Sequence, residues 1–279
     1  MTTIQDQYLS GVSDKVRVTF ARVVVSEWRK LVSVRSTWWT LGIAVALYAG
    51  IGALVSLYMR SNGSAVDPAE ATDLAIGPVQ MVQLAIVVLA VMIITSEYST
   101  GQIRVSATAV PTRLPLLGAK ALVLSAAVFV AAVLGEALSV GMGLLIAGDT
   151  MAFGLPGAET ARLLVGAPVY LVGVALLTFG VAGLMRSTGG AIATMMGLLV
   201  VVEQLLMGIQ FHVTKLIAPW LPGNAGTLVL YNTENLEYVR DHVVSPGAYL
   251  GPWWGLTVLV AWAALFVVLA GVRLRLRDA

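Results

Sequence analysis

Two carboxylates stand inside long apolar stretches of this 279-residue chain, and they are the side chains best placed to do chemistry. Glu136 and Glu203 each lie in a run long enough to cross a membrane. A carboxylate at that depth costs several kcal/mol, so it faces a cavity or a bundle interior, or it is protonated. Such a group can line the path of a translocated molecule or relay protons. It can equally be a buried carboxylic acid that joins helices through hydrogen bonds.

Three glutamines can extend a polar path around these carboxylates. Gln80 and Gln83 share one apolar run, and Gln204 directly follows Glu203. Amide side chains both donate and accept hydrogen bonds, so they can partner a buried carboxyl or a polar substrate. The candidate substrate-pathway residues are therefore Gln80, Gln83, Glu136, Glu203 and Gln204.

No pattern in the sequence indicates catalysis. The phosphate-binding G-x-x-x-x-G-K-[ST], the H-E-x-x-H and the G-x-S-x-G motifs are absent, and the chain has no cysteine. The two histidines, His212 and His242, fall in one polar stretch near the end of the chain. His242 follows Asp241, but a loop histidine is usually solvated. We expect no catalytic residue, no metal and no cofactor in this chain.

The composition is that of a protein that crosses a membrane several times. Hydrophobic residues make up 58% of the chain and charged residues 11%, against about 25% charged in a soluble domain. A net charge of +2 argues against nucleic-acid binding. We predict an all-α membrane protein with six spans of roughly 20 residues or more. These are residues 38–58, 74–96, 118–147, 163–185, 188–210 and 253–272, the fourth and fifth joined by a tight "RSTGG" hairpin whose glycines permit positive φ.

The distribution of lysine and arginine predicts the orientation. With a cytoplasmic N-terminus, 13 of the 17 basic residues fall on the inner side, as the positive-inside rule requires. Both termini are then cytoplasmic, and the protein is a multi-pass protein of the plasma membrane. Residues 38–272 form the transmembrane domain, and residues 273–279 form a basic cytoplasmic tail.

Residues 1–37 contain a segment with a helical period. Apolar residues from Val16 to Val34 share one face at about 100° per residue, with basic residues opposite. This pattern predicts a helix lying in the inner membrane interface, in contact with lipid. The alternative is a plain topogenic segment. The basic residues of the predicted surface helix are Lys15, Arg22, Arg29 and Lys30.

The polar segment "EYSTGQIRVSATAVPTR", Glu97 to Arg113, separates the second and third spans. Part of it has a helical pattern, which Gly101 and Pro111 interrupt at its two ends. A short amphipathic helix on the cytoplasmic side can anchor the loop to the surface or dock a soluble partner. The spacing does not distinguish these roles.

The order of these features resembles the permease subunit of an ABC-2 type (type V exporter-like) transporter, in its actinobacterial-like form. In that family the segment reads Glu, Gly-Thr, a basic residue, then Pro and a basic run. Gln102 stands here where Thr is usual. "SEWRKLVSVRSTWW" resembles the family's elbow helix, and "APWLPGNAG" resembles its loop after the fifth span. The matching residues of the segment are Glu97, Gly101, Arg104, Pro111 and Arg113.

The resemblance implies a function and a set of partners. Residues 97–117 would be the coupling loop, seated on a separate ABC ATPase subunit present in two copies, which holds the ATP and Mg²⁺. A second permease, expected to be an identical chain, would complete a dimer that exports a hydrophobic or amphipathic drug, natural product, peptide or lipid. The extracellular residues 211–252 would fold into short helices. Two other classes stay open: an ion-coupled secondary transporter using Glu136 and Glu203, and a non-transporting immunity or anchor subunit.

Overall fold

The computed structural model of the chain describes residues 19–61, 77–99, 113–147, 157–209, 211–245 and 247–277. All regular structure within these ranges is helical. Six helical segments are long and apolar enough to cross a membrane, which confirms the predicted number of spans. The chain is therefore an all-helical, multi-pass membrane protein.

The spans are formed by α3, α5, α7, α8, a continuous helix made of three parts, and α14. The first helix described, α2, precedes them, and short helices stand between the fifth and sixth spans. The bounds are α2 Phe20–Ser33, α3 Arg35–Ser61, α5 Val79–Ser99, α7 Arg113–Ala147, α8 Gly157–Met185, α9 Thr188–Met196, a π-helical turn Gly197–Val202, α10 Glu203–Gly208, α11 His212–Ile217, α12 Pro222–Thr227, α13 Thr233–Tyr238 and α14 Pro252–Arg277.

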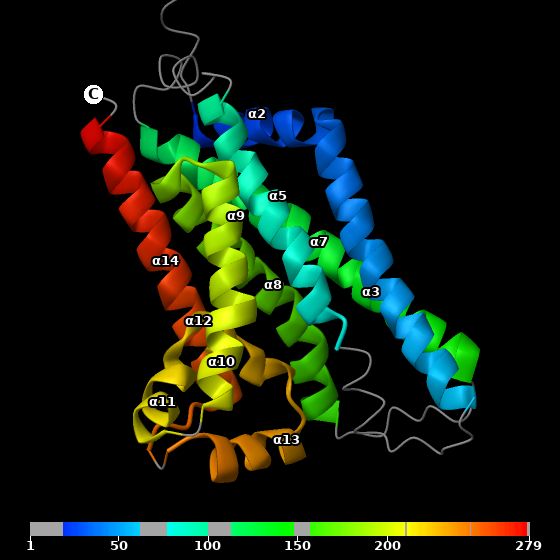
Figure 1. The fold of residues 1–279 in the computed structure, drawn as a ribbon. Helices are drawn as coiled ribbons and strands as arrows, with labels where there is room; N and C mark the ends of the chain where they lie inside the picture. The colour runs from blue at the N-terminus through cyan, green and yellow to red at the C-terminus, as the bar shows by residue number, and fades with distance from the viewer. Residues whose placement is uncertain are drawn as a thin grey trace, which may run out of the picture.

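The elements divide between two ends of the bundle (Figure 1). Helix α2 lies across one end of the bundle, and the last turns of α14 reach the same end. The short helices α11, α12 and α13 gather at the opposite end. We call these the α2 end and the α13 end.

Several boundaries differ from the sequence prediction, and two of them have a local cause. Helix α5 begins at Val79 instead of residue 74, because Pro78 lacks an N–H and its carbonyl accepts the N–H groups of the first helical turn. Helix α7 begins at Arg113, five residues early, since Pro115 is tolerated in a first turn. The predicted loop 97–117 is thus helical at both ends, over residues 97–99 and 113–117.

The tight turn between α8 and α9 corrects the expectation for its glycines. The residue with positive φ is Arg186, at 56°, while Gly189 and Gly190 lie inside α9. The side chain of Ser187 accepts the N–H of Gly190 and caps the helix. The cap starts α9 directly after the turn, so the glycines become helical.

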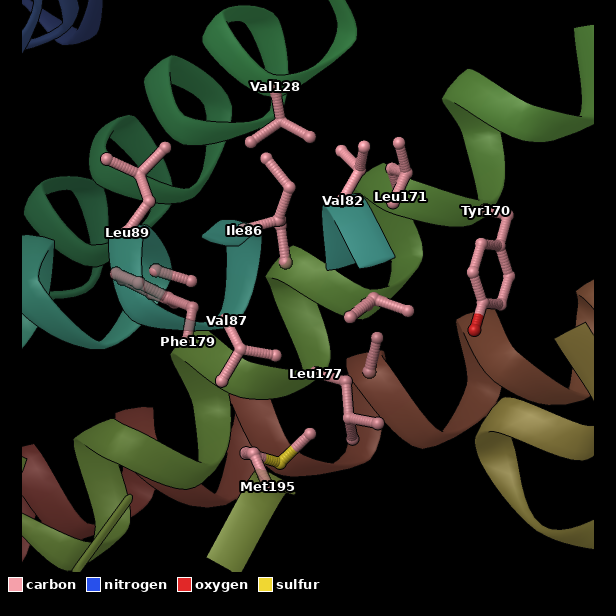
Figure 2. Close-up of a cluster of buried hydrophobic side chains, with 14 of the residues drawn as sticks. Val82, Ile86, Val87, Leu89, Val128, Tyr170, Leu171, Leu177, Phe179 and Met195 are labelled. Atoms are coloured by element: carbon pink, nitrogen blue, oxygen red, sulfur yellow. The ribbon is translucent and has the colours of Figure 1, made fainter. Parts of the chain in front are cut away.

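The core of the bundle lies where α5, α7, α8 and α9 meet, and Figure 2 shows its side chains. Helix α8 is the most buried span. Because lipid is as apolar as these side chains, close packing holds the helices together more than exclusion of water does. The labelled core residues are Val82, Ile86, Val87, Leu89, Val128, Tyr170, Leu171, Leu177, Phe179 and Met195.

Glycines let α8 approach α14 closely. A Cβ on Gly180 would stand 2.6 Å from the backbone of Phe266 and Val267, and a Cβ on Gly173 would stand 2.7 Å from Leu259. Real Cβ atoms are not found so near backbone atoms. The α8–α14 contact therefore requires a residue without a side chain at 180.

We predict that Gly180→Ala lowers the stability of the bundle by about 1–3 kcal/mol, because the added methyl group forces α8 and α14 apart. The control is Gly141→Ala in α7, where a Cβ would meet nothing within 4 Å. The measurement is the Tm of each purified variant in mild detergent. Equal Tm values for the two variants would contradict the packing described.

Candidate functional site

A polar cavity of about 520 Å³ lies at the α13 end. Four of the five sequence-predicted pathway residues line it, although they come from two helices far apart in the chain. Gln80 and Gln83 belong to the first turns of α5, while Glu203 and Gln204 begin α10. Side chains of α8, α12 and α13 complete the wall.

Helix α12 forms one side of the cavity and is inserted into the bundle. Every residue from Pro222 to Gly226 is buried, although the helix is only one and a half turns long. A Cβ on Gly255 of α14 would stand 2.1 Å from the carbonyl oxygen of Ala225, and one on Gly226 would meet Leu259 at 2.7 Å. Small residues thus let the backbone of α12 reach the depth of the spans.

Glu203 holds the beginning of α12. Its Oε1 accepts the backbone N–H of Gly223 at 2.9 Å, and the side chain is 2% exposed. The amide nitrogen of Asn224 donates to the carbonyl of Ala218 at 3.0 Å and to that of Glu203 at 3.5 Å. N–H groups in the first turn of a helix have no partner within the helix. The carboxyl group supplies one where water is scarce.

Other hydrogen bonds fix the wall of the cavity. The hydroxyl of Tyr170 donates to Oε1 of Gln83 at 2.7 Å, which ties α8 to α5. The hydroxyl of Thr227 donates to the carbonyl of Asn224 at 3.0 Å within α12. No sequence pattern indicates Tyr170 or Asn224, because the role of each depends on a residue in another helix.

A second set of bonds attaches α13 to the first turn of α8. Oε1 of Glu159 accepts the N–H of Thr233 at 2.7 Å and its hydroxyl at 2.9 Å. Arg162 lies 3.5 Å from the same carboxylate and donates to the carbonyl of Val229 at 3.2 Å. These bonds hold α13, whose Asn235 and Tyr238 line the polar cavity, against α8.

Glu136, the fifth predicted pathway residue, lies elsewhere. It is buried where α7 packs against α3, and its Oε1 has no hydrogen-bond partner among the described residues. The same holds for the hydroxyls of Tyr48 and Ser139 in this interface. The structure therefore does not bring the two intramembrane carboxylates into one site.

At the α2 end, a carboxylate that sequence reasoning passed over anchors α2. Glu27 is 4% exposed, and its Oε2 lies 2.5 Å from Nζ of Lys120 in α7. Its Oε1 bonds Nζ of Lys30 at 2.7 Å. These three side chains border a cavity of about 340 Å³ between α2, α3, α5 and α7. The available signal was an acidic residue four positions after Val23, on the apolar face of the predicted helix.

The other residues of the predicted surface helix and coupling segment are described in part. Arg22 and Arg29 are exposed on α2, as the pattern predicts, whereas Lys15 lies outside the described residues. Gly101, Arg104 and Pro111 also lie outside them. Glu97 ends α5 and Arg113 begins α7, with their side chains outside the description.

The His242 region has the chemistry of a solvated surface. Asp241 bonds Arg240 at 2.8 Å, and this hydrogen bond lowers the pKa of the Asp241 carboxyl. The ring of His242 stacks on Tyr238. Among the described residues, no group of three or more His, Asp or Glu side chains is placed to hold a metal ion.

The chain matches no protein-family model and no curated protein. Its function must therefore be argued from the two cavities and the helices that form them.

We predict that Glu27 and Lys120 are energetically coupled. Glu27→Leu or Lys120→Leu alone destabilises the protein by about 3–5 kcal/mol, because each leaves a buried charge without this partner. The double variant costs less than the sum of the two, by about 0.5–3 kcal/mol. Thermal or denaturant unfolding in detergent measures the cycle.

The matched control for this cycle is the exposed pair Arg240 and Asp241, whose side chains are 51% and 54% exposed. Arg240→Gln and Asp241→Asn should show no coupling, since water screens an exposed pair. Strictly additive effects at positions 27 and 120 would show that the buried pair does not hold α2 to α7.

Proposed function

We propose that the chain is the transmembrane permease subunit of an ATP-driven ABC exporter, of the ABC-2 type. It forms the path of a hydrophobic or amphipathic compound and couples that path to a separate ATPase. The observation that supports this proposal most is the polar cavity at the α13 end. A bundle that needed only to anchor a partner would gain nothing from a cavity lined by amides and a carboxyl at span depth.

The two ends of the bundle suit the two parts of the proposed function, contact with the ATPase and release of the compound. In the proposal the α2 end faces the cytoplasm, where α2 and the segment from Glu97 to Arg113 contact the ATPase. The α13 end faces outward and holds the cavity from which the compound leaves. Lys120 lies two turns into α7, directly after that segment, so its ion pair with Glu27 joins the two proposed contact regions.

ATP hydrolysis is assigned to a partner because the sequence carries no phosphate-binding loop. Two ATPase copies and a second permease, an identical chain in the simplest assembly, would complete the transporter. ATP and Mg²⁺ would bind to the ATPase. This chain would then be a carrier and not an enzyme.

The position of Glu136 bears on the ion-coupled alternative. A proton relay through both carboxylates requires them to share a polar path, but Glu136 lies between α3 and α7 and Glu203 lies against α12. Either carboxylate alone could still carry an ion. The immunity or anchor alternative requires neither the cavity nor the segment at 97–113.

Purification of the tagged full-length chain from its native membranes in mild detergent, followed by mass spectrometry, tests the assignment. We expect a near-stoichiometric soluble chain with a phosphate-binding loop, and ATPase activity in the eluate. A second permease sequence would indicate a heterodimer. A chain that elutes alone in several mild detergents would contradict the ABC assignment and direct attention to ion-driven transport.

We predict that Glu97→Ala and Gly101→Pro each abolish transport-coupled ATPase activity while membrane insertion remains normal. The reason is that both changes alter the segment proposed to transmit the motion of the ATPase. The measurement is the ATPase rate of the reconstituted complex with and without a transported compound.

Matched controls for these two variants come from the segment between α3 and α5, which the predicted topology places on the other side of the membrane from the segment 97–113. Glu70→Ala and Gly63→Pro make the same changes of residue type there and should leave the coupled rate unchanged. Wild-type coupled rates in Glu97→Ala and Gly101→Pro would remove the coupling role of the segment.

A further inference from the structure

The polar cavity at the α13 end has an unusual balance of charge. Among its described lining residues, Glu203 is the only carboxylic acid and no lysine, arginine or histidine is present; the rest are amides, hydroxyls, glycines and apolar residues. A negative group in surroundings of low dielectric attracts a cation and repels a second anion far more strongly than in water. The charge of the wall therefore favours a positively charged guest.

The hydrogen bonds within the wall point the same way. Three polar groups of the wall already donate hydrogen bonds to other protein atoms. They are the hydroxyls of Tyr170 and Thr227 and the amide nitrogen of Asn224. What these groups retain is oxygen lone pairs. Because an ammonium group has three donors and no acceptor, it complements these three groups better than a carboxylate or phosphate does.

The carboxyl group of Glu203 can accept more hydrogen bonds than its contact with α12 uses. A carboxylate offers about four lone-pair positions. The N–H of Gly223 uses one of them, and the backbone of Asn224 also faces the group. The remaining positions can accept a guest's donors while α12 stays capped.

Part of the cavity wall is apolar. Leu199, Met207, Val239 and Val243 line it beside the polar groups. At about 520 Å³ it has the size of an ordinary small-molecule site. A guest with one polar head and a hydrocarbon body would contact both kinds of surface.

We infer that this cavity binds amphipathic amines, with Glu203 as the counter-ion of the ammonium group and the apolar side chains around the hydrocarbon part. The inference deepens the proposed function by naming the class of compound that the permease carries. Binding itself needs no ATPase, so it can be measured on the purified full-length chain.

The test uses two probes of the same chain length and opposite charge, octylammonium and octanoate. Equilibrium dialysis against the chain in a non-ionic detergent measures binding, and detergent alone corrects for partitioning. We expect the wild-type chain to bind octylammonium about tenfold more tightly than octanoate or better, the effect of one hydrogen bond to a charged group. This comparison needs no variant, so it stands even where a variant fails to fold.

Glu203→Gln is the decisive variant. The amide oxygen can still accept the N–H of Gly223, so α12 keeps its cap while the charge is lost. Octylammonium binding should weaken about tenfold, and octanoate binding should stay constant or improve. The matched control is Glu136→Gln, which neutralises the other buried carboxyl outside this cavity and should leave both probes unaffected.

Several results would overturn the inference: no binding above the detergent blank, equal binding of the two probes, preference for octanoate, or unchanged octylammonium binding in Glu203→Gln. These results are separate from those that test the exporter assignment. A chain that binds octylammonium through Glu203 but purifies with no ATPase keeps its ligand class and loses the ABC assignment. A chain that purifies with an ATPase but prefers octanoate keeps the ABC assignment and loses the proposed ligand class.

Discussion

The hydrogen bond between Glu203 and the first turn of α12 is the contact on which the α13 end depends. A short helix at the depth of the spans exposes N–H groups that water cannot reach, and each costs several kcal/mol unless the protein supplies an acceptor. Glu203 supplies it at 2.9 Å, and the absence of a side chain on Gly223 permits the approach, since a Cβ there would stand 2.0 Å from Oε2. The polar cavity is bordered by α12 together with residues of α5, α8 and α10.

The sequence predicts the six spans well because each is a long apolar run, and length alone distinguishes such runs. It predicts helix ends less well, because an end depends on local bonds such as the Ser187 cap or the carbonyl of Pro78. It also identifies four residues of the cavity, since polar side chains at span depth are rare and must meet something polar. It could not separate Glu136 from these four, because the partner of a buried carboxyl is set by which helices pack together.

The ion pair of Glu27 is a second case in which the packing of helices, and not the local sequence, sets the partner of a charged residue. In a helical wheel Glu27 interrupts an apolar face and looks like a misplaced charge, yet that face packs on α7 where Lys120 lies. Val23 of α2 packs with Leu116 and Ala119 one turn away, so apolar side chains cover one side of the buried pair. Removing such a pair's partner is costly, and a buried pair also tolerates little change of geometry. It therefore fixes the position of α2 on the bundle more narrowly than apolar packing alone would.

The two intramembrane carboxylates differ in what their surroundings supply, and this difference decides which of them suits a ligand. Oε1 of Glu136 meets an interface closed by close packing, since a Cβ on Gly135 would already stand 2.9 Å from Tyr48. Glu203 is equally buried but borders a cavity, and a backbone N–H orients its carboxyl group. Orientation by the backbone and access from a cavity are the two properties that a counter-ion for a bound cation requires, and only Glu203 of these two has both.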